Sequence, residues 1–204
     1  TTSKVGFFCM NISWSYSLCV LAKRFGDRPA VIDSLGKTLS YDRLNTSAHS
    51  VANALIALGI SPGQSAASLL PNSIEAVSTS YGIRLSGAAE TPLSWGYTLE
   101  EILWCAQLAK FEYVITTKER ERELQAAGLR TINIETLLAP RHQHSPNPLL
   151  GKELPAVDAN TTGRILFTSG TTGKPKGVTY THGARWTGEQ LLKATLPFTP
   201  KPGE

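Results

Sequence analysis

The stretch RILFTSGTTGKPKGV, residues 164–178, carries the strongest structural and chemical signal in the chain. Ile165, Leu166 and Phe167 form a short apolar run with the length expected of a buried strand. The ten residues that follow, 168–177, include three glycines, four hydroxyl side chains and two lysines. Glycines let the backbone approach a ligand closely, hydroxyls donate hydrogen bonds to phosphate oxygens, and lysines supply positive charge. The stretch therefore predicts a phosphate-binding loop at the end of a strand.

Two common phosphate-binding patterns do not fit this loop. A Walker A loop aligned on the Gly-Lys pair at 173–174 requires glycine, and serine or threonine, where the chain has Thr168 and Pro175. This mismatch also disfavours a kinase. The dinucleotide fingerprint Gly-x-Gly-x-x-Gly fails because Gly170 and Gly173 have the wrong spacing. A flexible hydrophilic hairpin is the remaining alternative, and the density of hydroxyls and lysines argues against it.

The longer stretch FTSGTTGKPKGVTYTH, residues 167–182, resembles the signature loop of the adenylate-forming superfamily. That superfamily contains acyl- and aryl-CoA synthetases, adenylation domains of nonribosomal peptide synthetases and firefly luciferase. The match is complete from Thr168 to Gly177, and the Thr181-His182 pair is also typical. In the family this loop closes on the β- and γ-phosphates of ATP while AMP is transferred to a carboxylate and pyrophosphate leaves.

The resemblance implies a set of ATP-binding residues in this loop. They are Thr168, Ser169, Gly170, Thr171, Thr172, Gly173 and Lys176. The implied catalytic residues are Lys176 and Thr168, and Lys176 would pair with the phosphate charge. Lys174 is equally well explained as a solvated charge at the rim of the loop. The resemblance also implies ATP, Mg²⁺, a small carboxylic acid and CoA as cofactors and substrates.

Composition and charge narrow the class of protein. The chain has 204 residues, 41% of them hydrophobic and 18% charged, which suits one sizeable globular domain. The net charge is +4, and the positively charged residues are scattered along the chain. The run at 118–123 alternates basic and acidic residues, which predicts a solvated helical face and not a basic patch, so we expect no nucleic-acid partner. Cys9, Cys19 and Cys105 have no metal-ligand spacing, and we predict no metal ligand among them.

The same features give an expected location. No apolar run approaches the length that spans a membrane, and the polar residues within the first 20 make a poor signal peptide. An odd number of cysteines without paired spacing is typical of buried thiols in a reducing compartment. We therefore expect a cytoplasmic protein without an integral membrane segment.

Strands and helices alternate along most of the chain. Period-2 and apolar runs predict strands at 30–33, 38–40, 66–70, 113–116, 131–134 and 165–167. Apolar residues on one face, with capping residues Ser40 and Thr98, predict helices at 41–58, 73–85 and 98–109. We also expect helices at 15–25, which Gly26 would end, at 119–127, which is polar, and at 183–194. This order predicts an α/β fold with helices layered on a mainly parallel sheet.

The resemblance extends to three further segments, at 38–44, at 59–63 with 70–73, and at 85–93. They are similar to scaffold motifs of the family, and we expect Tyr41 and Pro92 to be packing and turn residues. By this resemblance the chain is the N-terminal part of the large adenylate-forming domain. We expect a first αβ region at 1–138, a proline-rich connector at 139–157 that is exposed over 139–155, and the strand, phosphate loop and following helix of a second αβ region at 158–204.

The resemblance also indicates what these 204 residues do not contain. The family's segment that contacts adenine and magnesium, its ribose-binding aspartate, its hinge and its C-terminal lid domain with the catalytic lysine have no counterpart here. We therefore expect an N-terminal fragment of an acid–CoA ligase, inactive alone. The alternative is a truncated, non-catalytic relative that serves as a nucleotide-binding or regulatory module. The acid, the choice between CoA and a carrier protein as acceptor, and the oligomeric state stay open.

Overall fold

The computed structural model describes residues 14–139, 154–168 and 174–195. The described helices are α1 Trp14–Phe25, α2 Tyr41–Ala57, α3 Ile74–Leu85, α4 Leu99–Ala109, α5 Lys118–Ala126, α6 Ile134–Leu137 and α8 His182–Thr195. The described strands are β1 Pro29–Ile32, β2 Thr38–Ser40, β3 Ser65–Leu69, β4 Ala89–Leu93, β5 Tyr113–Thr116, β6 Arg130–Asn133, β7 Thr162–Thr168 and β8 Lys176–Thr181. The predicted α/β fold with helices on a mainly parallel sheet is confirmed.

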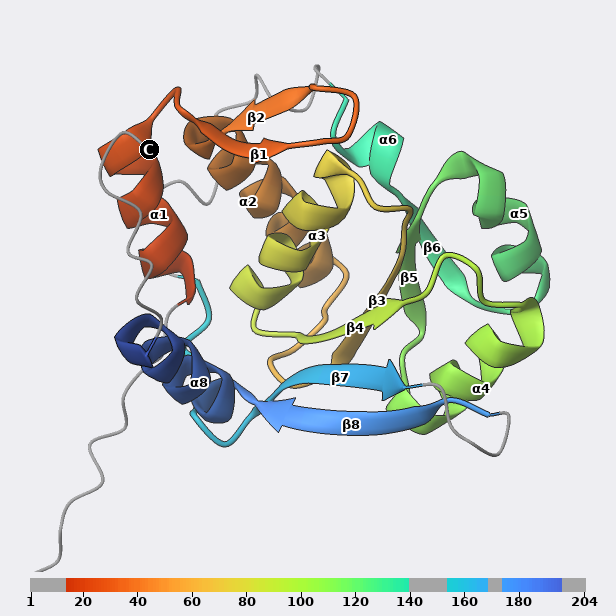
Figure 1. The fold of residues 1–204 in the computed structure, drawn as a ribbon. Helices are drawn as coiled ribbons and strands as arrows, with labels where there is room; N and C mark the ends of the chain where they lie inside the picture. The colour runs from red at the N-terminus through yellow and green to blue at the C-terminus, as the bar shows by residue number, and fades with distance from the viewer. Residues whose placement is uncertain (1–13, 140–153, 169–173, 196–204) are drawn as a thin grey trace, which may run out of the picture.

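A six-stranded sheet in the order β6-β5-β3-β4-β7-β8 forms the centre of the molecule (Figure 1). Neighbouring strands from β6 to β7 are parallel, and only β8 runs antiparallel to its neighbour β7. The short β1 and β2 form a separate antiparallel pair. The sheet therefore joins β7 and β8, which carry the predicted phosphate loop, to the strands of the first αβ region.

Helices cover both faces of this sheet (Figure 1). On one face, Leu55 of α2 and Ile83 of α3 pack in one buried cluster with Ile115 of β5. On the other face, Ile102 of α4 and Leu124 of α5 pack with residues of β3 and β5. Helix α1 packs beside α2 and α3 in a third cluster, away from the sheet.

Capping residues set the helix starts as the sequence predicts. The Ser40 hydroxyl accepts a hydrogen bond from the Arg43 N–H at the start of α2. Before α4, Thr98 and Glu101 form a complete capping box, with 2.8 Å between the Thr98 nitrogen and the Glu101 carboxylate. These bonds satisfy N–H groups that the first helical turn leaves without partners.

Strand β4 was not predicted, and it corrects the expectation for Pro92. Pro92 is a strand residue paired with Ser68, not a turn residue. The described ladder between β4 and β7 contains only the pair Glu90–Arg164, so Pro92 lies outside the paired residues on that side of β4. A proline, which lacks an N–H group, is tolerated where a ladder ends.

Strand β8 and helix α6 were also not predicted. After the phosphate loop the chain forms β8, which pairs antiparallel with β7. Strand β8 therefore separates the loop from helix α8, the helix predicted at 183–194. Strand β8 contains Val178, Thr179 and Tyr180, which have high β-strand propensity. This run is too short for the sequence alone to distinguish a strand from the end of the loop. Val157, the last residue of the expected connector, is buried.

The thiols of Cys19 and Cys105 are free, whereas Cys9 lies outside the described residues. Cys105 is fully buried in the cluster beneath α4. Burial, together with the nearby Glu101 carboxylate, raises the pKa of the Cys105 thiol to about 11. Cys105 is therefore an inert packing residue at neutral pH.

Candidate phosphate-binding site

The predicted loop begins at the carboxyl end of β7 and returns at the start of β8. Thr168, the last residue of β7, pairs across the hairpin with Lys176, the first residue of β8. The Thr168 hydroxyl lies 3.5 Å from the Lys176 carbonyl oxygen, and both side chains are exposed. The structure therefore brings the two implied catalytic residues together where the loop joins β7 and β8, and we call this Thr168–Lys176 pair the hairpin mouth. The other implied residues, Ser169, Gly170, Thr171, Thr172 and Gly173, lie outside the described residues.

The hairpin mouth lies at the carboxyl edge of the parallel strands. Figure 1 shows the arrowhead of β7 ending beside α4, where the grey trace begins. In open α/β sheets, ligands bind in crevices outside the carboxyl ends of the strands. The position of Thr168 and Lys176 therefore suits a ligand site.

Trp104 of α4 contacts the returning half of the loop. Its indole N–H donates a hydrogen bond to the Pro175 carbonyl oxygen at 3.0 Å. The Lys174 ammonium group lies over the indole ring, 4.5 Å from the ring centroid. Lys174 is exposed and Pro175 is buried, so the chain is held at Pro175 just before it enters β8. The sequence gives no local signal for Trp104, which lies 71 positions from its partner.

A buried carboxylate beneath the hairpin was also missed by the sequence reasoning. Glu90 of β4 is 1% exposed and is surrounded by three arginines. Its carboxylate lies 3.6 Å from Arg84 of α3, 3.4 Å from Arg164 of β7 and 3.1 Å from Arg185 of α8. The Ser80 hydroxyl donates a further hydrogen bond to Glu90. This cluster ties the strand that leads to the phosphate loop to the rest of the sheet.

His182, which follows β8, is a second buried polar residue near this cluster. A Cβ atom at Gly163 would lie 2.9 Å from the His182 ring, so only glycine leaves room for the imidazole there. Burial lowers the pKa of His182; a hydrogen bond with the Gly87 backbone opposes that shift, and Arg185 and Arg84 add to it. The imidazole is therefore neutral at neutral pH. No role was predicted for this residue beyond its place in the family motif.

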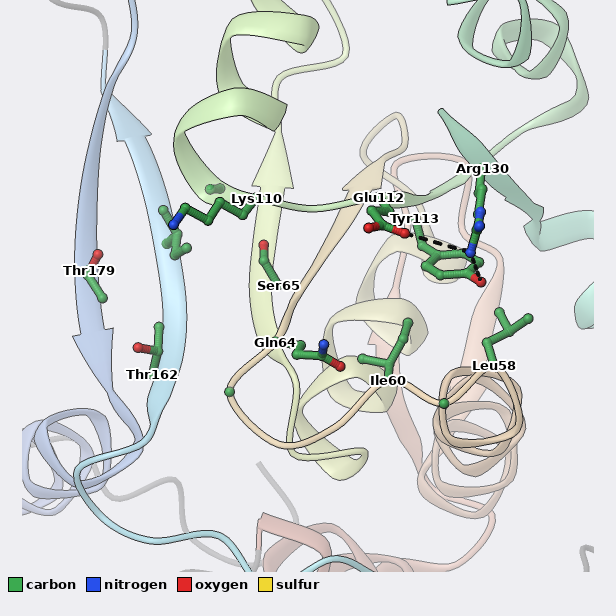
Figure 2. A pocket seen from close by; sticks show the side chains of 14 residues that line it. Leu58, Ile60, Gln64, Ser65, Lys110, Glu112, Tyr113, Arg130, Thr162 and Thr179 are labelled. Atoms are coloured by element: carbon green, nitrogen blue, oxygen red, sulfur yellow. Dashed lines mark hydrogen bonds and ion pairs between the residues drawn. The ribbon is translucent and has the colours of Figure 1, made fainter. Parts of the chain in front are cut away.

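A hollow of about 570 Å³ lies at the opposite edge of the sheet (Figure 2). It is lined by the first residues of several strands, including Ser65, Tyr113, Arg130 and Thr162. The Arg130 guanidinium donates a hydrogen bond to the Tyr113 hydroxyl at 3.0 Å. Of the predicted site residues that the structure describes, neither Thr168 nor Lys176 lines this hollow.

The described residues contain neither a metal-binding cluster nor a membrane-spanning helix. No group of three or more histidine, cysteine, aspartate or glutamate side chains in the described ranges is placed to hold a metal ion. No helix in the described part of the chain is long and apolar enough to cross a membrane.

The sequence is similar to those of known proteins. Residues 20–197 match the family described as AMP-binding enzyme. The chain is 34% identical over 170 residues to 4-coumarate-CoA ligase 1 of Narcissus pseudonarcissus, a match that covers 78% of the chain and 31% of the ligase. It is 31% identical over 163 residues to nonribosomal peptide synthetase 8 of Aspergillus fumigatus, covering 80% of the chain and 2% of the synthetase.

The fold also matches solved structures. The inhibitor-bound N-terminal domain of FACL13 from Mycobacterium tuberculosis superposes with a TM-score of 0.74 and 26% identity, covering 91% of this chain and 48% of that one. The chain therefore spans less than half the length of each of these relatives. The resemblance to adenylate-forming enzymes is confirmed. With the family match extending over residues 20–197, the chain belongs to the AMP-binding enzyme family.

Proposed function

We propose that this chain supplies the phosphate-binding loop of an enzyme that activates a carboxylic acid with ATP, through an acyl-adenylate. The observation that carries the proposal is the pairing of Thr168 and Lys176 at the mouth of the β7–β8 hairpin. A hydroxyl donor and an exposed ammonium group are the side chains that suit phosphate oxygens. The chemistry of this mouth therefore fits the polyphosphate of ATP.

The reaction gives this end of the hairpin a defined task. A carboxylate oxygen attacks the α-phosphorus of ATP, the bond from that phosphorus to the β-phosphate oxygen breaks, and pyrophosphate leaves with the electron pair. Lys176 would stabilise the negative charge that grows on the leaving phosphates, and Thr168 would orient them by hydrogen bonding. The described residues contain no group of three or more side chains that could hold a metal by themselves; Mg²⁺ would reach the site bound to the phosphates of ATP.

We propose CoA as the acceptor of the acyl group, in line with the 34% identity to a CoA ligase. The 31% identity to a peptide synthetase favours a carrier-bound thiol as the second candidate. The two acceptors share a thiol nucleophile that attacks the acyl-adenylate and releases AMP. Incubation of an enzyme carrying this region with ATP, an acid panel and either thiol would distinguish the two by the thioester formed.

ATP binding by the chain tests the proposal directly. We expect Lys176→Ala to raise the dissociation constant for ATP about tenfold or more, because a charge-assisted contact is lost. Thr168→Val, which removes one neutral hydrogen bond, should raise it about fivefold. The measurement is isothermal titration calorimetry with MgATP. Lys118→Ala is the matched control, since Lys118 is exposed on α5 and should leave ATP affinity unchanged.

Catalysis is a separate question from binding. Because the chain spans 31% of the ligase it matches, we expect no acid-dependent exchange of pyrophosphate into ATP by the 204-residue chain itself. Exchange by this chain would contradict that expectation. Wild-type affinity for ATP in Lys176→Ala would contradict the proposed role of the hairpin mouth.

A further inference from the structure

The side chain of Trp104 touches the returning half of the phosphate loop in two different ways. Its N–H group donates to the Pro175 carbonyl oxygen at 3.0 Å, and its ring face carries the Lys174 ammonium group at 4.5 Å from the centroid. The two contacts use different parts of the indole, the polar edge and the π face. One side chain thus restrains two consecutive residues of the loop.

Helix α4, which carries Trp104, is itself firmly placed. The capping box of Thr98 and Glu101 fixes its first turn. The turn before it is held from α5, because the Arg120 guanidinium donates to the carbonyl oxygens of Trp95 and Tyr97 at 3.0 and 3.1 Å. The inner face of α4 is buried against the sheet. Trp104 therefore projects from a rigid support.

The consequence for the loop concerns which lysine reaches the ligand. The ammonium group of Lys174 is directed onto the Trp104 ring, whereas Lys176 stands exposed opposite Thr168. We propose that Trp104 is a positioning residue: it fixes Lys174 and Pro175, and so sets Lys176 at the hairpin mouth as the main phosphate contact. This inference rests on the proposed function, since it names how that same loop is held.

The contact itself is tested without any ligand. In the wild-type chain, we expect the methylene protons of Lys174 to be shifted upfield in the NMR spectrum by the ring current of Trp104. Trp104→Phe keeps an aromatic face and should retain part of this shift, whereas Trp104→Leu should abolish it. Leu108→Ala is the control, because Leu108 is 49% exposed on the same helix and should not change the shift.

The effect on the site is tested by ATP titration of the same variants. Trp104→Leu loses both contacts and should raise the dissociation constant for MgATP about tenfold, and Trp104→Phe, which loses the hydrogen bond alone, about threefold. Lys174→Met should weaken MgATP binding much less than Lys176→Met, because the Lys174 ammonium group contacts the Trp104 ring and not the phosphates. Trp104→Leu and Lys174→Met combined should be non-additive, because the two residues act as one unit.

Three results would overturn the positioning role. They are an unshifted Lys174 in the wild type, wild-type ATP affinity in a Trp104→Leu chain that melts cooperatively, and equal losses from Lys174→Met and Lys176→Met. A wild-type chain that binds no ATP contradicts the proposed function instead. The positioning role is then decided by trypsin cleavage after Lys176, which should be faster in Trp104→Leu than in Leu108→Ala; equal rates would reject it.

Discussion

Glu90 is a buried charge that several elements of this protein share. Its carboxylate is 1% exposed and lies within 3.6 Å of guanidinium groups from three different elements, Arg84, Arg164 and Arg185. Removing one member of a buried ion pair leaves the other charge desolvated and without compensation. At Glu90 the loss would affect three cations simultaneously.

We expect Glu90→Gln to lower the free energy of unfolding by about 3–5 kcal/mol, measured by urea denaturation. The amide preserves size and hydrogen bonding with Ser80, so the change isolates the charge. Glu112→Gln is the control: Glu112 is 73% exposed and pairs with Arg130 at 3.6 Å. Its loss should cost less than about 1 kcal/mol, because solvent screens exposed pairs. Equal losses in the two variants would contradict the structural role of Glu90.

His182 makes stability depend on pH in one direction. Because burial lowers its pKa in the folded protein, the unfolded chain binds a proton that the folded chain resists. The contribution of His182 to stability is thus fully present above the unfolded pKa of about 6.5 and is lost as pH falls through the folded pKa. We expect the urea concentration at the unfolding midpoint to decrease as the pH is lowered from 7.5 to 5.5. The decrease should be smaller in His182→Gln. Identical pH slopes in the two proteins would refute this assignment.

Helices α2 and α3 pack closely where they cross because residue 82 of α3 is glycine. A Cβ atom at Gly82 of α3 would lie 2.4 Å from the Val51 Cβ atom and 2.7 Å from the Ala48 carbonyl oxygen of α2. Backbone atoms cannot move aside as a flexible side chain can, so these two helices are held at a separation that only glycine allows. Helix propensity alone would favour alanine at this position.

Gly82→Ala should therefore destabilise the fold by about 1–3 kcal/mol, through overpacking. Gly188 of α8 provides a matched comparison, because a Cβ atom added there meets nothing within 4 Å. Gly188→Ala should stabilise the fold by up to about 1 kcal/mol, since it reduces the entropy of the unfolded chain. Thermal unfolding of both variants gives the two signs, and a stabilising Gly82→Ala would show that α2 and α3 separate freely.

Over the whole molecule, local patterns in the sequence predict the alternation of strands and helices and the helix starts at Ser40 and Thr98. They miss β4, where Pro92 contradicts strand propensity, and β8, whose identity depends on pairing with β7. In the site, the family motif finds Thr168 and Lys176. Contacts across the fold leave no local trace: Trp104 lies 71 positions from Pro175. Such pairs are set by tertiary packing, which a single sequence does not display.

The separation between Glu90 and its partners has a consequence for how the chain is made. Arg185 is 95 positions later in the sequence than Glu90. On a ribosome, β3, β4 and the helices around them are complete long before that arginine emerges. Contacts of long sequence separation form late, because the entropy of closing the loop must be overcome first. The nascent domain therefore holds Glu90 with Arg84 alone of these three arginines, and Arg164 and Arg185 join the carboxylate only when β7 and α8 dock.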